Sequence, residues 1–255
     1  MRKRLDFGTG TFGDMGCHIY DPVFKALALT APLSIRSDGP LPNDQSWATD
    51  AIIDYIFPGT AFTEGKTVRV VWYDGDQRLP KEIQDAEKFV KGEKGKGMPD
   101  QGSIFLGTKG VMILPHVSQP RLVGKEVEGE SHWNQFIETV LGNRPNTDAN
   151  WDYSGPLTEA VLLGSVATRF PKQMLAWDAA AVKLTNVAKA NALLKCALAD
   201  GVCTRGDCAD GGGAREAVGA ISRGDLAGDH FRDQAAPRGM AYATTARAPH
   251  PSSTC

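Results

Sequence analysis

Asp14 and His18 lie four residues apart in a glycine-rich segment near the start of the chain. If this segment forms a helix, residues at that spacing share one face of it. A carboxylate next to an imidazole, which titrates near neutral pH, is a common arrangement for moving a proton during catalysis. We therefore interpret Asp14 and His18 as a candidate catalytic pair. The alternative is structural: Asp14 would cap the helix and complement its positive end, and His18 would be a buried histidine with satisfied hydrogen bonds.

The glycines before this pair have the spacing Gly8-x-Gly10-x-x-Gly13, which matches a dinucleotide-binding loop. Such a loop follows a strand, and only a few residues precede Gly8, so we interpret the match as chance. Cys17 lies in the same segment and is a nucleophile in principle. On a helix its side chain would point away from the acid and the imidazole, and we expect it to be a small buried hydrophobe.

The sequence does not favour a metal site. His116, His132 and Asp21 are the residues that could join His18, and their positions fit no metal-ligand spacing. The chain has five cysteines, an odd number, and four of them lie beyond residue 195 without a CxxC pattern, so we expect free thiols. These four are Cys196, Cys203, Cys208 and Cys255.

The composition argues against several classes of protein. With 255 residues and 42% hydrophobic content, the chain can bury a sizeable core. Its net charge is -2 and its basic residues are scattered, so nucleic acid is not an expected partner. No apolar run approaches the roughly 20 residues that cross a bilayer, and no membrane association is expected. We expect a soluble, cytoplasmic protein; the alternative is export, if a signal lies in sequence upstream of this chain.

The chain divides into two parts of different composition near residue 195. Every lysine and every tryptophan lies at or before Lys195, whereas residues 196–255 are rich in Ala, Gly, Arg and Asp. Large apolar residues are too sparse in this second part to offset the loss of chain entropy on folding. We therefore expect a folded domain over 1–195 and a disordered tail over 196–255. The abrupt loss of lysine leaves open that the tail is an out-of-frame extension.

Periodicity in the first part predicts an α+β domain. Apolar residues at helical spacing predict three helices, the first of them interrupted by Pro22, and runs of β-branched and aromatic residues predict three strands and a hairpin. The order of helix, strands, helix pair and short strands favours α+β over a doubly wound parallel sheet. The expected helices cover 15–29, 133–141 and 157–167, the last opened by Ser154-Gly155-Pro156, and the expected strands cover 33–36, 51–57, 67–73, 103–106 and 111–114.

Four segments, taken in order, resemble the C-terminal half of the Gfo/Idh/MocA oxidoreductases, the family of glucose-fructose oxidoreductase and inositol dehydrogenase. The resemblance covers about residues 5–194 and none of the tail. Each segment alone is a weak signal, whereas the ordered set is fairly specific, particularly for a bacterial subgroup. The segments are Asp6–Gly10 running into Gly13–Pro22, Trp72–Gly75, Gly107–Gly110 and Asp152–Gly164.

The resemblance implies a large, mostly antiparallel sheet with helices on one face. In the family this domain holds a sugar or polyol, and subunits pair into a homo-oligomer through the sheet. The Rossmann domain that binds NAD or NADP has no counterpart in this sequence, nor has the lysine of its Glu-Lys-Pro segment. The reaction implied is hydride transfer at a secondary alcohol carbon. We therefore expect a substrate-binding domain that is inactive alone.

The resemblance also assigns roles to individual residues. By position, His18 matches the family's proton-transferring histidine and Asp14 its acidic partner, while Asp21 and Tyr153 are implied to contact substrate. For Asp21, an Asp-Pro step that interrupts a helix is an equally good explanation. Tyr153 and Glu159 also fit structural roles, since acids near a helix N-terminus commonly offset its dipole. No cofactor-binding residue is assigned.

Two other functions remain open at this point. Some relatives use NAD transiently to cleave glycosides, and Asp14 and His18 alone do not distinguish that reaction from alcohol oxidation. A protein of a different class, a non-catalytic assembly module that pairs through its open sheet face, also fits the pattern.

Overall fold

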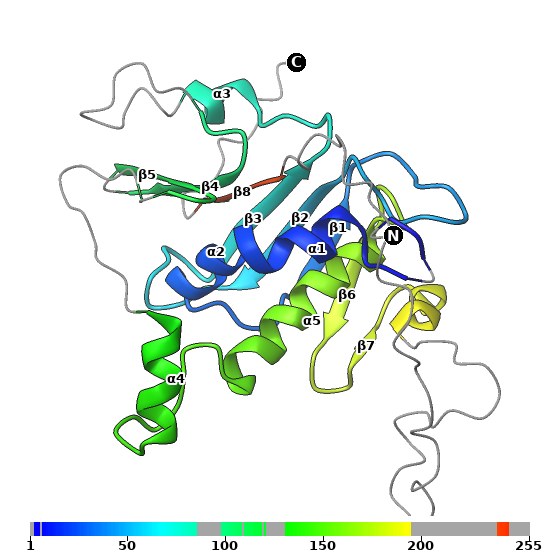
Figure 1. Ribbon diagram of the computed structural model, residues 1–255. Coiled ribbons are helices and arrows are strands. Elements are labelled where there is room, and N and C mark those ends of the chain that lie inside the picture. Colours follow the sequence, from blue (N-terminus) through cyan, green and yellow to red (C-terminus); the bar gives the residue numbers. More distant parts are fainter. Residues whose placement is uncertain are drawn as a thin grey trace, which may run out of the picture.

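The computed structural model describes residues 3–5, 7–85, 98–108, 110–118, 120, 131–194 and 239–244, with the backbone alone for residues 132 and 239–244. Helices and strands alternate irregularly along this part of the chain (Figure 1). In chain order they are α1 (Gly10–Ile19), α2 (Asp21–Ala26), β1 (Ser34–Ser37), β2 (Ile52–Pro58), β3 (Thr67–Asp74), α3 (Lys81–Gln84), β4 (Gly102–Gly107), β5 (Gly110–Pro115), α4 (His132–Val140), α5 (Trp151–Ala167), β6 (Met174–Asp178), β7 (Lys183–Leu184), a 3₁₀ helix (Ala188–Leu194) and β8 (Gly239–Thr244).

The described strands form one mostly antiparallel sheet, in the order β5-β4-β8-β3-β2-β1-β6-β7. Every neighbouring pair is antiparallel except β4 and β8, which run parallel. The expected α+β class is therefore confirmed. The five expected strands are also confirmed, each within one residue at either end, whereas β6, β7 and α3 were not placed by periodicity.

Strand β8 comes from the segment that composition predicts to be a disordered tail. Its residues, 239–244, pair with β3 on one side and with β4 on the other, so they lie inside the sheet. Over these six residues the expected disorder is wrong, because two neighbouring strands complete the backbone hydrogen bonds that the segment could not satisfy by itself. The remainder of the expected tail, 196–238 and 245–255, lies outside the described residues.

One face of the sheet carries the main core, with α1, α2 and α5 lying across it (Figure 1). In β2, Ile53, Tyr55 and Phe57 are fully buried and alternate with more exposed residues, as the two-residue period of a strand requires. The ring of Phe12, in α1, packs on Trp72 of β3 with their centroids 4.7 Å apart. Aromatic contacts of this kind fix α1 on the sheet.

The opposite face of the sheet carries a second and smaller apolar cluster. It includes Val71 of β3 and Ile104 of β4, and Leu79, which precedes α3, belongs to it as well. Nearer β2 the same face becomes polar, where the Arg69 guanidinium donates to the Asp54 carboxylate with Nη2 and Oδ2 2.6 Å apart. This face is thus part apolar and part charged.

The ends of two helices differ from the expectation. The first expected helix is two helices, α1 and α2, which meet at Tyr20, with Pro22 in the first turn of α2. Helix α5 begins before the expected Ser-Gly-Pro opening, because the Asn150 side chain caps it by accepting from the Tyr153 N–H at 3.2 Å. Pro156 consequently lies inside α5.

Helix α4 carries its apolar stripe on an exposed side. Trp133 is 79% exposed and Phe136 is 59% exposed, although the periodicity predicts that this stripe packs into a core. Over 133–140, where the structure describes the side chains of this helix, the buried residue is Gln135, whose Nε2 donates to Asp148 Oδ2 at 2.9 Å. Figure 1 shows α4 apart from the sheet. Clusters of exposed apolar side chains are typical of surfaces that another domain or chain covers.

Candidate functional site

The candidate site is built on α1, a helix that contains three glycines. Gly10 begins it at a φ of +82°, and a Cβ there would lie 2.8 Å from Cβ of Trp47. Gly16 allows close approach to α5, because a Cβ would lie 3.1 Å from both methyls of Val161. Ser165 of α5 donates to the Thr9 carbonyl at 2.8 Å, just before α1. Tight packing therefore keeps this segment helical despite the low helix propensity of glycine.

Asp14 and His18 lie one helical turn apart on α1, and both are exposed. The structure thus gives them the spacing and the accessibility that a proton-handling pair needs. Two structural alternatives are wrong: His18 is not buried, and Asp14 lies in the middle of α1, too far along to cap it. The glycines that suggested a turn lie inside the helix, which begins at Gly10. His18 lies in the last turn of α1.

A second imidazole lies beside His18. The rings of His18 and His116 have centroids 5.7 Å apart, although 98 residues separate them in the sequence. His116 follows β5, and its Nδ1 is 3.0 Å from Oε1 of Gln101, which precedes β4. Ser103 of β4 donates to the Ile19 carbonyl at the end of α1 at 2.6 Å. The β4–β5 hairpin is thereby fastened to the end of α1 that carries His18.

Cys17 lies between the members of the pair and is exposed, so the expectation of a buried hydrophobe is wrong. Its thiol is near the Asp14 carbonyl, with Sγ and O 3.3 Å apart. Partial burial of the sulfur and the nearby Asp14 carboxylate raise the pKa of Cys17. A thiol with a raised pKa forms less thiolate at neutral pH, so the site gains no nucleophile from this residue.

Asp21 and Tyr153, the two residues implied to contact substrate, contact one another. The Tyr153 hydroxyl donates to the Asp21 carboxylate. Burial, the hydrogen bond to Asp21 and the charge of that carboxylate raise the pKa of Tyr153. The Lys25 ammonium lies 4.8 Å from the centre of the Tyr153 ring and 3.8 Å from the Asp148 carboxylate. These contacts join α2 to α5, which is a structural role, while Asp21 and Tyr153 each remain partly exposed.

Replacing Tyr153 with phenylalanine is expected to lower the free energy of unfolding by about 1–2 kcal/mol, because the Asp21 carboxylate loses a charge-assisted hydrogen bond. Urea denaturation measures the change. Asp21→Asn keeps an oxygen that accepts the bond and is the matched control. Asp21→Ala removes the acceptor, and combining it with Tyr153→Phe isolates the pairwise energy. Equal stabilities for Tyr153→Phe and the parent protein would contradict a stabilising role for this contact.

Glu159 also has a structural partner. Its Oε1 accepts from Nε1 of Trp177, in β6, at 2.8 Å. This hydrogen bond ties the middle of α5 to β6, so Glu159 has a structural role. The expected reason for that role is wrong, because Glu159 lies in the middle of α5 and not in the first turn, where an acid offsets the helix dipole.

Asp74, in the Trp72–Gly75 segment, is a buried carboxyl at the end of β3. It is 1% exposed, and it accepts from the Ala51 N–H at 2.5 Å and from Nε1 of Trp72 at 2.8 Å. Burial raises its pKa to about 6, against the effect of these two hydrogen bonds, and the nearby Asp50 raises it further. Asp74 connects the end of β3 to the start of β2, so we assign it a structural role.

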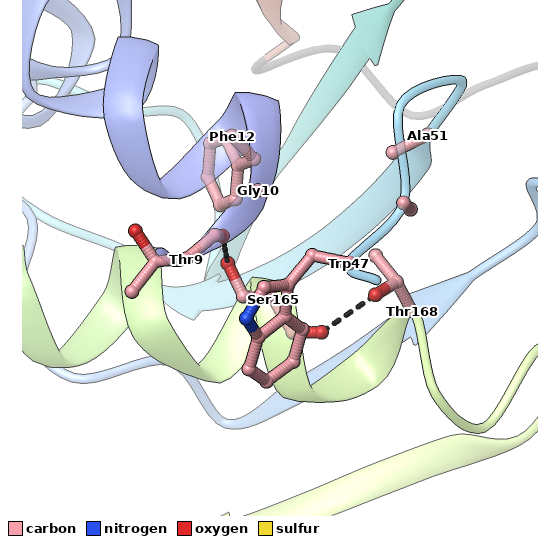
Figure 2. A pocket seen from close by; sticks show the side chains of 8 residues that line it. Thr9, Gly10, Phe12, Trp47, Ala51, Ser165 and Thr168 are labelled. Atoms are coloured by element: carbon pink, nitrogen blue, oxygen red, sulfur yellow. Dashed lines mark hydrogen bonds between the residues drawn. The ribbon is translucent and has the colours of Figure 1, made fainter. Parts of the chain in front are cut away.

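A shallow hollow lies at the other end of α1, where Figure 2 shows the side chains that line it. Two of its hydroxyl groups bond within the protein: Ser165 donates to the Thr9 carbonyl, and Thr168 donates to the Ser165 carbonyl at 2.6 Å. Apolar atoms of Phe12, Ala48 and Ala51 form much of the rest of its lining. The hollow is a packing feature at the start of the helix and is separate from the His18 end.

Within the described residues, no three His, Cys, Asp or Glu side chains gather in a way that could hold a metal ion. The helices that the structure describes include none with both the length and the apolar character needed to cross a membrane. Lys109, in the expected hairpin turn, lies outside the described residues, as does the side chain of His132. Comparison with models of known protein families finds no match, and no curated protein matches the sequence.

Sequence reasoning missed three features of this region: the contact of His116 with His18, the contact of Gln101 with the His116 ring, and the burial of Asp74. The sequence suggests His116 only as a metal ligand, because nothing local in the sequence connects it to His18. Gln101, which holds the His116 ring, carried no signal of its own. Asp74 matched an Asp-Gly turn signal, and its burial follows from strand pairing that composition does not show.

Proposed function

We propose that this chain is the substrate-binding and oligomerisation domain of an NAD(P)-dependent sugar or polyol oxidoreductase that transfers hydride at a secondary alcohol. One observation carries the proposal: Asp14 and His18 lie exposed, one turn apart, on a helix fixed in the core. The ordered resemblance of four sequence segments supports it. An imidazole exposed in this way can accept the proton of a substrate hydroxyl, and the neighbouring carboxylate can orient the imidazole or the substrate.

The glycine segment of α1 does not fit a dinucleotide. In a dinucleotide-binding loop, glycines let the backbone approach a pyrophosphate. Here a Cβ on Gly13 would overlap the Thr9 side chain, and Gly10 packs against Trp47, so these glycines serve contacts inside the protein. In the proposed enzyme the nicotinamide cofactor, which supplies the hydride acceptor, is therefore held by a separate domain. This chain contributes proton handling and substrate contacts.

We further propose that the enzyme is a homo-oligomer in which sheets pair. The sheet face away from α1 and α5 supports this along β2, where the partly exposed side chains of Ile52 and Ile56 lie beside the charged pair of Arg69 and Asp54. Such a mixture of apolar and charged side chains is typical of subunit interfaces.

A non-catalytic assembly module is the second candidate. The exposed stripe of α4, with Trp133 and Phe136, favours it, because this apolar surface suits a partner and needs no chemistry. The coding sequence immediately upstream distinguishes the two functions. An in-frame segment with Gly-x-Gly-x-x-Gly and Glu-Lys-Pro is expected for the oxidoreductase, and an upstream sequence without them would favour the assembly module.

The 255-residue chain is expected to show no binding of NAD or NADP in isothermal titration calorimetry. The reason is that the glycine segment packs against Thr9 and Trp47 and leaves no backbone cradle for a pyrophosphate. The protein extended by its upstream reading frame serves as the control and is expected to bind. Binding of either dinucleotide to the 255-residue chain with micromolar affinity would contradict this division of the site.

A further inference from the structure

The apolar stripe of α4 is a surface that stays open in the described part of the chain. It consists of five side chains at helical spacing, each between 52% and 79% exposed: Trp133, Phe136, Ile137, Val140 and the C-cap residue Leu141. The stripe contains no ionisable side chain. Figure 1 shows α4 apart from every other helix and strand that the structure describes. A patch that includes aromatic side chains and lacks charge has the composition of an interface core.

Polar contacts hold α4 from the side opposite the stripe. With about 3.6 residues per turn, Gln135 lies opposite the centre of the stripe. There its Nε2 donates to Asp148 Oδ2 at 2.9 Å, and its Oε1 accepts from the Asp148 N–H at 3.1 Å. Arg144 Nη2 donates to Asp148 Oδ1 at 2.8 Å, and Lys25 Nζ of α2 lies 3.8 Å from the same oxygen. Because these contacts fix which side of α4 faces outward, association orders few further groups, and its entropic cost is lower.

We propose that the stripe pairs with the same stripe of a second copy of the chain, so that two α4 helices pack antiparallel about a two-fold axis. Such an axis brings the same patch of both copies together. With the axis between Phe136 and Ile137, Trp133 of each copy faces Val140 of the other. Each large ring then meets a smaller branched side chain, whereas a parallel pair would place both Trp133 rings at one end. This interface is separate from the sheet face and does not depend on the proposed reaction.

The area of the stripe is sufficient for a dimer. A fully exposed aromatic side chain offers about 150–250 Å², and at their exposed fractions the five residues together present roughly 600 Å². Two copies therefore bury roughly 1,200 Å², which is the lower end of specific, stable interfaces. The largest contributor is Trp133, and tryptophan is enriched among the residues that carry most of the binding energy in interfaces. A second copy thus accounts for the whole stripe.

Sedimentation velocity of the 255-residue chain over a range of concentrations tests the pairing. Phe136→Glu places a charge in the middle of the stripe and is expected to halve the mass of the parent assembly, to a monomer, or to a dimer if sheets also pair. Trp133→Ala removes a ring that the interface contains twice and is expected to raise the dissociation constant by about tenfold or more. Phe62→Glu makes the first change between β2 and β3, at a residue 66% exposed, and is expected to keep the parental mass.

Circular dichroism of each variant checks that the fold is retained, as expected for replacements of exposed side chains. An associated parent whose mass is unchanged in Phe136→Glu, or whose dissociation constant is unchanged in Trp133→Ala, would overturn the stripe pairing and leave the pairing of sheets standing. A monomeric parent chain would overturn both pairings and assign the stripe to a different partner. The proposed reaction is judged separately, by oxidation of polyols, so a halved mass in Phe136→Glu without any oxidation would retain the interface and overturn the reaction.

Discussion

Replacing Gly164 with alanine is expected to lower the free energy of unfolding by about 3 kcal/mol. Gly164 lies in α5, where that helix crosses α1 and β2. A Cβ at this position would overlap the Tyr55 hydroxyl and the ring of Phe12, and both side chains are fully buried or nearly so. The Tyr55 hydroxyl also donates to the Ala160 carbonyl at 2.8 Å, so relieving the overlap would break a buried hydrogen bond. The cost far exceeds the gain of about 1 kcal/mol that alanine brings to a helix.

Gly155 provides the matched control for this substitution. It lies in the same helix, and a Cβ there would have no neighbour within 4 Å. Gly155→Ala is therefore expected to stabilise the protein by about 0.5–1 kcal/mol, through helix propensity alone. Urea denaturation followed by circular dichroism measures both variants. Adding Tyr55→Phe to Gly164→Ala removes the closest atom and is expected to restore part of the loss. Equal stabilities for the two alanine variants would show that α5 does not pack on β2 as described.

Asp74 is expected to make the stability of the protein depend on pH in the acidic range. Its pKa is raised by burial from 3.8 to about 6, so the folded state binds more protons than the unfolded state between these values. The free energy of unfolding contributed by this group therefore falls as pH rises from about 4 to about 6. The full change is about 3 kcal/mol, complete above pH 6.

The comparison of Asp74→Asn with the parent protein isolates this effect. The variant does not titrate, so its unfolding free energy, measured by urea denaturation from pH 4 to pH 7, is expected to lose this falling slope. An asparagine amide keeps one acceptor for the two donors, Ala51 N–H and Trp72 Nε1, so a constant loss of about 1–3 kcal/mol accompanies the change. Asp76→Asn alters an exposed carboxyl two residues away and is the control, expected to keep the parent slope. A parental slope in Asp74→Asn would contradict the burial of this carboxyl.

Local patterns were sufficient for elements whose stability is largely local. The run over 67–73 predicts β3, and the apolar runs on either side of a Gly-containing turn predict the β4–β5 hairpin, because alternation and turn residues act between near neighbours. Helix α1 was predicted to begin after its glycines, since glycine disfavours helices in isolation. Packing against α5 and Trp47 determines where α1 begins, and this packing involves residues far away in the sequence.

Long-range pairing explains what the sequence could not show. Strand β8 has no strong strand signal, since three of its six residues are glycine or alanine, and it becomes a strand by entering between β3 and β4. The spacing of Asp14 and His18 correctly placed both on one helix. Their neighbour His116 reaches His18 only because the β4–β5 hairpin is fastened to α1 through Ser103. The exposed stripe of α4 was predicted as an apolar helix face, but periodicity does not tell which surface covers it.

Oxidation of polyols by the protein extended through its upstream reading frame tests the central proposal most directly. The measurement is the absorbance of NADH or NADPH at saturating dinucleotide, with a panel of sugars and polyols that includes glucose and myo-inositol. The proposal predicts reduction with at least one of them, and a fall in turnover of about 100-fold or more in His18→Ala with unchanged dinucleotide affinity. Cys17→Ala, one residue away and also exposed, is expected to retain parental turnover. No reduction with any member of the panel, or parental turnover in His18→Ala, would contradict the proposal.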